Sequence, residues 1–298
     1  MEALRHILPL LVSLSLGSLV LAIGLNATLD DALYLFKRPR LLLRAFLAIS
    51  VVVPAAAMLI VAVLPLQPIS KAGVVIMAIA PVPPLAPGKQ LKMGGDKAYV
   101  YGLYTAFALL AVAIVPASVF VLNLVYGKAV VIPMFELLRL VVLSVLLPLG
   151  LGLGIGAAVP RLAPALSSAV SKVSMLLILA IFVALMAVAW PQILAATGNG
   201  TVLAILVVVA VGLAAGHLLG GPEHNDRVAL AVAASCRHPG IALMIAGANG
   251  QNPRLTAVII LFVLLSVLAT LPYQLWVKPH RSLRRRWGVR AGRPSPPI

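Results

Sequence analysis

The sequence has little charge and almost no cysteine. Charged residues make up 10% of its 298 residues, and only seven residues are acidic. Cys236 is the single cysteine, which excludes an intramolecular disulfide. The sequence has no Walker A loop, no HExxH or GxSxG motif and no metal-spaced His/Cys cluster, and its acids are too scattered to form a catalytic carboxylate pair. These absences predict a protein that is not an enzyme and has no cofactor or metal site.

Apolar residues make up most of the chain. They account for 62% of the sequence, and the mean hydropathy is +1.11. A soluble domain of this composition would expose a large apolar surface to water, so the sequence indicates a membrane protein. The apolar runs have the length of about 20 residues that spans a bilayer as a helix, not the roughly 10-residue alternation of a barrel strand. The predicted fold class is therefore an all-α membrane protein.

The apolar runs predict about nine transmembrane helices. Their ranges are 7–27, 42–64, 70–88, 98–124, 135–158, 166–189, 201–220, 227–249 and 255–277. An odd number places the two termini on opposite sides of the membrane. Basic residues concentrate in alternate connections and in the tail 278–298, which makes that side cytoplasmic by the positive-inside rule. We expect a multi-pass protein of the inner (plasma) membrane with its N-terminus outside, and a first run that is retained as a helix and not cleaved.

The net charge of +16 follows from the same basic connections and tail. This distribution predicts contact with anionic lipid, not with nucleic acid. The sequence does not predict an oligomeric state.

Two of the nine runs are interrupted. Four prolines fall between Pro81 and Pro87, and the stretch from Arg237 to Gly240 reads RHPG in the middle of the eighth run. Proline lacks an amide donor, so both runs should form broken helices. Each broken helix lies between two ordinary ones, which is the pattern of an inverted-topology repeat. We predict a first repeat over 1–124 with its break near 81–88, and a second over 125–277 with its break near 237–240.

Three segments resemble the bile acid:sodium symporter family. They are Gly24 to Pro54 (GLNATLDDALYLFKRPRLLLRAFLAISVVVP), the proline-broken third run, and Leu230 to Ala242 (LAVAASCRHPGIA). The resemblance covers nearly the whole chain. It implies a core domain in which the broken third and eighth runs cross, packed against a panel domain of the first, fifth and sixth runs. It also implies that substrate lies between these domains and that they move in alternating access.

The sequence departs from the family at its sodium-binding motifs. Sodium-coupled members carry a PGGTxSN-like run in the first broken helix, and an ExGxQNSG-like run whose Glu and Gln coordinate sodium in the second. In alignment with these, the Ser-Asn pair becomes Ala86-Pro87, the Glu becomes Ala233, the Gln becomes Arg237 and the Asn becomes His238. A site that loses its carboxylate and gains a guanidinium repels sodium. We predict that sodium coupling is lost.

Arg237 is the most informative residue of the sequence. A guanidinium in mid-membrane costs at least about 2.5 to 3.5 kcal/mol, and it usually lines a cavity with a partner. Three interpretations stay open: a fixed cation in the place of sodium, a ligand for a substrate carboxylate, or a residue of an aqueous loop. His238 is either the carrier of a coupling proton, since its unperturbed pKa is about 6.5, or a neutral hydrogen-bonding histidine at the helix break.

Other candidates are weaker. Lys89 is either a cytoplasmic loop charge or a cation of the inner vestibule, and Asn26 is a candidate substrate contact. Thr105 is the Ser/Thr hydroxyl that remains in the stretch 104–108 of the fourth run, where the resemblance implies such hydroxyls. Pro84, Pro87 and Pro239 are candidates through the two breaks that they shape. We also expect Asp30 and Asp31 to cap a short helix before Lys37.

The predicted function is that of a secondary transporter of a small organic anion. A carboxylate such as a bile acid fits the charge of the predicted site, and movement is either facilitated or proton-linked. Two alternatives remain: a sodium-coupled symporter of the same family, and a membrane sensor or scaffold that transports nothing. The expected partners are the organic anion and membrane lipid.

Overall fold

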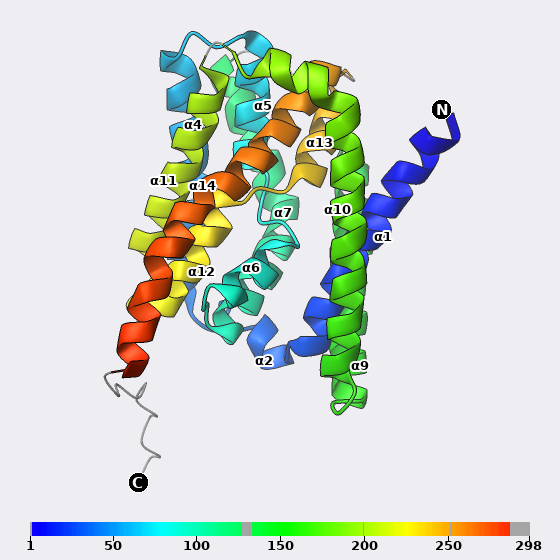
Figure 1. Ribbon diagram of the computed structural model, residues 1–298, viewed down its shortest axis with the longest axis vertical. Coiled ribbons are helices and arrows are strands. Elements are labelled where there is room, and N and C mark those ends of the chain that lie inside the picture. The colour runs from blue at the N-terminus through cyan, green and yellow to red at the C-terminus, as the bar shows by residue number, and fades with distance from the viewer. Residues whose placement is uncertain (1, 127–130, 132, 199, 251, 287–298) are drawn as a thin grey trace.

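The computed structural model describes residues 2–126, 131, 133–198, 200–250 and 252–286 (Figure 1). These residues form helices and contain no strand, which confirms the prediction of an all-α membrane protein. Of the expected basic tail, residues 287–298 lie outside the described residues. The part of the tail before them continues the last helix as far as Arg286.

In the described part of the chain, seven helical segments are long and apolar enough to cross a membrane. They are Pro39–Val63, Lys97–Val125, Met134–Ala158, Ala163–Ala196, Thr201–Leu219, His224–Ala248 and Pro253–Val277. Two shorter apolar helices, Leu14–Asn26 and Pro68–Ile79, fall within the first and third predicted runs. A total of nine spans therefore remains a prediction.

The first half of the chain contains the first broken helix. Its elements are α1 (Glu2–Asn26), α2 (Leu29–Ala32), α3 (Pro39–Phe46), the π-helical segment η1 (Leu47–Val52), α4 (Val53–Val63), α5 (Pro68–Ile79), α6 (Ala86–Lys92) and α7 (Lys97–Tyr126). The chain passes from α3 through η1 to α4 without a break, so these three elements correspond to the second predicted run.

The second half contains the second broken helix. Its elements are α8 (Met134–Val141), the π-helical segment η2 (Val142–Leu146), α9 (Leu147–Ala158), α10 (Ala163–Ala196), α11 (Thr201–Leu219), α12 (His224–Ser235), α13 (Pro239–Ala248) and α14 (Pro253–Arg286). The interruption between α12 and α13 lies at residues 236–238, close to the predicted 237–240.

Helices α1, α9 and α10 pack together on one side of the molecule (Figure 1). Small residues allow α1 and α9 to approach closely: a Cβ atom on Gly24 would lie 2.5 Å from the Leu149 carbonyl oxygen, and one on Gly152 would lie 2.4 Å from that of Leu21. Close backbone approach of this kind is how helices associate in lipid, where no hydrophobic force draws them together. The three helices fall in the first, fifth and sixth predicted runs, which the family resemblance assigns to a panel domain.

The broken helices lie in the interior of the helical bundle, surrounded by other helices. In the most apolar stretch of α12 and α13, 72% of the residues are buried, against 6% in that of α10. Helices α5, α11, α13 and α14 share one hydrophobic core that includes Met77, Ile205, Ile241 and Phe262. An interrupted helix needs this protection, because its unpaired backbone groups find no hydrogen-bonding partner in lipid.

Candidate functional site

The candidate site is the place where the two broken helices meet. Helix α5 packs against α13 and α6 packs against α12, so the two broken helices cross where each is interrupted (Figure 1). The last helical bond of α5 runs from the Ala80 amide to the Met77 carbonyl at 3.2 Å. Prolines at positions 81, 83 and 84 then offer no amide, so the helix cannot continue before Ala86.

Arg237 lies buried in the connection between α12 and α13, with 4% of its surface exposed. Its Nη1 atom donates to the Ile49 carbonyl at 3.0 Å and to the Ala80 carbonyl at 3.4 Å, and its Nη2 atom donates to the Ala234 carbonyl at 3.0 Å. These three acceptors come from η1, the end of α5 and the end of α12. One guanidinium therefore joins both broken helices to a third element.

The Ile49 carbonyl is available because of Pro54. In a π-helix each carbonyl pairs with the amide five residues later, and for Ile49 that residue is a proline without an amide hydrogen. The π-helical segment and the proline that follows it thus leave an acceptor inside the bundle, and Arg237 occupies it.

His238 precedes α13 and caps its first turn. Its Nδ1 atom accepts a hydrogen bond from the Ile241 amide at 3.4 Å, which requires that nitrogen to be unprotonated. His238 is 5% exposed, and it lines a small space of about 10 Å³ together with Pro81 and Tyr104. A space of this size holds about one water molecule.

The other residues at the two breaks are positioned by local structure. Pro239 is the first residue of α13, and Pro87 is the second residue of α6. Pro84 is buried in the connection between α5 and α6. Ala86 and Ala233, which take the places of family sodium ligands in the alignment above, are both buried and bring no side-chain oxygen.

Lys89 points into the protein. Its Nζ atom donates to the hydroxyl of Thr270 on α14, and that threonine is fully buried. The next residue, Gln90, donates from Nε2 to the Ala229 carbonyl of α12 at 2.8 Å. Helix α6 is therefore held between α12 and α14 by two polar side chains.

Asn26 and Thr105 lie outside this hydrogen-bond network. The Asn26 amide donates to the Ser167 hydroxyl at 2.6 Å, and that hydroxyl donates to the Ala22 carbonyl at 2.7 Å, so Asn26 joins α1 to α10. Thr105 is buried in α7 with 7% of its surface exposed.

Two features of the structure, one at the crossover and one at the other end of α12, were not predicted from the sequence. The first is the acceptor role of Ile49, for which Pro54 inside an apolar run was the available signal. The second is Asp226 in the first turn of α12, which is 3% exposed and is the acid buried most deeply in the described part of the chain.

The connections at the lower end of Figure 1 carry the acidic and basic pairs. Asp31 takes part in the predicted cap, because it forms a capping box with the N-cap residue Thr28 at the start of α2, whereas Asp30 lies in the first turn and takes no part in the box. Lys37 lies 2.6 Å from the Asp30 carboxylate, and its hydrogen bond and charge lower the pKa of that carboxyl. Lys97 lies 3.7 Å from Asp31.

The fold and the site define a polytopic helical membrane protein with two broken helices crossing in its interior. Residues 13–197 of the chain match the family model described as the sodium bile acid symporter family. This range is more than half of the 298 residues, and the chain belongs to that family. A search of the curated proteins found no match.

Membership identifies the protein as a membrane transporter of the bile-acid or organic-anion type, in a family of transporters and not of enzymes. The matched residues include the first broken helix and end before the second, so Arg237 lies beyond them.

Proposed function

We propose that the protein is a secondary carrier of a small organic anion that works by alternating access without sodium coupling. The observation that carries this proposal is the buried guanidinium of Arg237 and its three carbonyl acceptors. Carbonyl oxygens that converge on one point form a site for a cation, and here a covalently attached cation occupies it. A cation that cannot dissociate holds the crossover together but cannot couple transport to an ion gradient.

The direction of the helix dipoles supports an anionic substrate. Ala80 follows the C-terminus of α5 and Ala234 lies in the last turn of α12, so Arg237 binds the negative ends of both half-helices. The N-termini of α6 and α13 begin at the same crossover and carry the positive ends. With the negative ends neutralised by Arg237, the net field at the crossover favours an anion.

The capping role of His238 supports facilitated movement. While its Nδ1 atom accepts a hydrogen bond from the Ile241 amide, protonation of that nitrogen would remove the cap of α13. A proton-linked cycle through His238 would therefore have to open this cap, and a dependence of the transport rate on pH would reveal it.

The proposed orientation has the N-terminus outside and the C-terminus in the cytoplasm of an inner (plasma) membrane. Elements α2, α6 and the C-terminal end of α14 lie at the same end of the molecule (Figure 1), and the basic connections accompany them. This arrangement fits the positive-inside rule. In the same proposal, 1–124 and 125–277 are the two inverted repeats, and the core moves against the panel formed by α1, α9 and α10.

Counterflow in proteoliposomes tests the proposed function. Vesicles loaded with one unlabelled organic acid should accumulate the same labelled acid from outside, across a panel from short carboxylates to a bile acid, and vesicles without protein should not. Exchange that requires sodium would favour the sodium-coupled alternative. A ligand that raises thermal stability without any exchange would favour the sensor or scaffold.

A further inference from the structure

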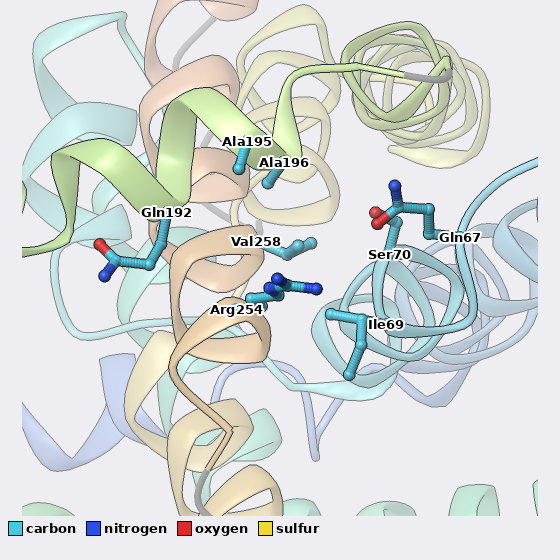
Figure 2. A pocket seen from close by; sticks show the side chains of 8 residues that line it. All are labelled: Gln67, Ile69, Ser70, Gln192, Ala195, Ala196, Arg254 and Val258. Carbon is cyan, nitrogen blue, oxygen red and sulfur yellow. The ribbon is translucent and has the colours of Figure 1, made fainter.

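A second polar pocket lies at the other end of α5 from the crossover. Its polar lining comes from Gln67 and Ser70 at the start of α5, Gln192 near the end of α10 and Arg254 at the start of α14, and its volume is about 150 Å³ (Figure 2). The twelve residues of α5 place this pocket about 18 Å along the helix from the broken segment. It is therefore a separate site from the one around Arg237.

Arg254 is the charge of this pocket. Its side chain reaches from α14 toward Gln67 and Ser70 (Figure 2). In the part of the chain that the structure describes, the acids in ion pairs are Asp30 and Asp31, and their partners are lysines. In the proposed orientation this arginine lies on the outer side, where positive charge is under-represented, so it is not explained by membrane topology.

The uncharged polar side chains of the pocket have donor and acceptor atoms that are not used within the protein. Ser70 is 4% exposed, and its oxygen accepts from the Thr201 hydroxyl at 2.9 Å, which leaves its own proton available. Gln192 has a buried Oε1 atom without a partner among the described residues, and its amide nitrogen offers two donors. The guanidinium of Arg254 and the buried Ser70 hydroxyl are donors of the pocket, and the two glutamine amides bring both donors and acceptors.

The size and walls of the pocket limit what fits. Its volume of about 150 Å³ is well above the roughly 10 to 15 Å³ that one water molecule needs. Ile69 and Val258 provide an apolar wall beside the polar groups. A wider hollow of about 380 Å³ adjoins it, shares Gln192 and Arg254, and is lined further by Asn252. A carboxylate on a short aliphatic chain matches this combination of donors, charge and volume.

We propose that this pocket is an outer docking site for a small carboxylate, with Arg254 as its charged ligand and Ser70 and Gln67 as further donors. The inference rests on the proposed function, because it makes the pocket the first place where the transported anion binds. Helix α10 belongs to the panel and α5 and α14 do not, so an anion held here would contact both of the parts that move. Short carboxylates, not steroid acids, are then the substrates that this site selects.

Binding and transport by one variant test the proposal. Propionate should raise the thermal stability of the purified protein, and neutral propionamide of nearly the same shape should not. In Arg254→Gln the shift with propionate should disappear, and the external KM for propionate in counterflow should rise about tenfold or more, because a charge-assisted pair is lost. Arg139→Gln, at an exposed arginine of α8, is the matched control and should leave both values unchanged.

Ser70→Ala provides a second variant that keeps the charge. It should weaken the stabilisation by propionate and raise the external KM for propionate in counterflow, by less than Arg254→Gln does. Transport with a wild-type KM in Arg254→Gln would overturn the docking site and leave the proposed function intact. Stabilisation by propionate that depends on Arg254, in a protein without any counterflow, would retain a carboxylate site and refute the carrier. Equal stabilisation by propionate and propionamide would overturn the anion site.

Discussion

Replacement of Arg237 by methionine removes the central contact of the crossover. Methionine has a similar length and no charge, so the variant leaves the carbonyls of Ile49, Ala80 and Ala234 without their donor. A buried acceptor without a partner costs about 1 kcal/mol or more, so three of them cost at least about 3 kcal/mol. Relief of the desolvation of the guanidinium offsets part of this loss. We expect a net destabilisation of about 2 kcal/mol.

Thermal unfolding of the detergent-purified protein measures this loss. For a chain of 298 residues, about 2 kcal/mol corresponds to a Tm lower by about 3 °C. Arg40→Met, at an exposed arginine of α3, is the control and should leave the Tm unchanged. Arg237→Met should also lose most of its counterflow, because the two half-helices no longer share a partner. An Arg237→Met variant with wild-type Tm and wild-type exchange would refute the role of a fixed cation.

Three further predictions follow from other contacts. Gly24→Ala should destabilise the protein by about 1 to 3 kcal/mol, because its Cβ would lie 2.5 Å from a backbone oxygen of α9. Gly150→Ala, whose Cβ would meet nothing within 4 Å, is the control and should leave the Tm unchanged. Equal Tm values for the two variants would contradict the packing of α1 against α9. Asn26→Ala should lower the Tm through the lost bond to Ser167, at about 1 kcal/mol, and leave the KM unchanged; a raised KM at wild-type Tm would make Asn26 a substrate contact. Arg237→Gln should become stabilised by sodium, as wild type is not, because the three carbonyls then need a mobile cation; a variant indifferent to sodium contradicts this.

The sequence was sufficient for the fold class because the solvent determines it. An apolar run of about 20 residues has few stable alternatives to a helix in lipid, so the helices coincide with the predicted runs to within a few residues at most ends. The two breaks were predictable for an equally local reason. Proline removes an amide donor wherever it stands, and the prolines after Ala80 and the one at Pro239 mark both interruptions.

The partners of Arg237 were not predictable from the sequence. The acceptor on Ile49 lies 188 positions away along the chain, and only the packed bundle brings the two residues together. Pro54 indicates that a carbonyl before it lacks an amide partner, but it does not show that the segment is π-helical or that Arg237 is the donor. The partner of Lys89 was not predictable for the same reason, because Thr270 lies 181 positions away along the chain.

The most direct test of the account is the exchange rate of the wild-type protein with and without sodium. Proteoliposomes with propionate on both sides should exchange the label at the same rate when sodium is replaced by choline at constant ionic strength and pH. Equal rates are the result that a carrier with Arg237 in the place of sodium predicts. A rate that falls to the protein-free level in choline would show that sodium is still required, and would contradict the replacement of the sodium site by Arg237.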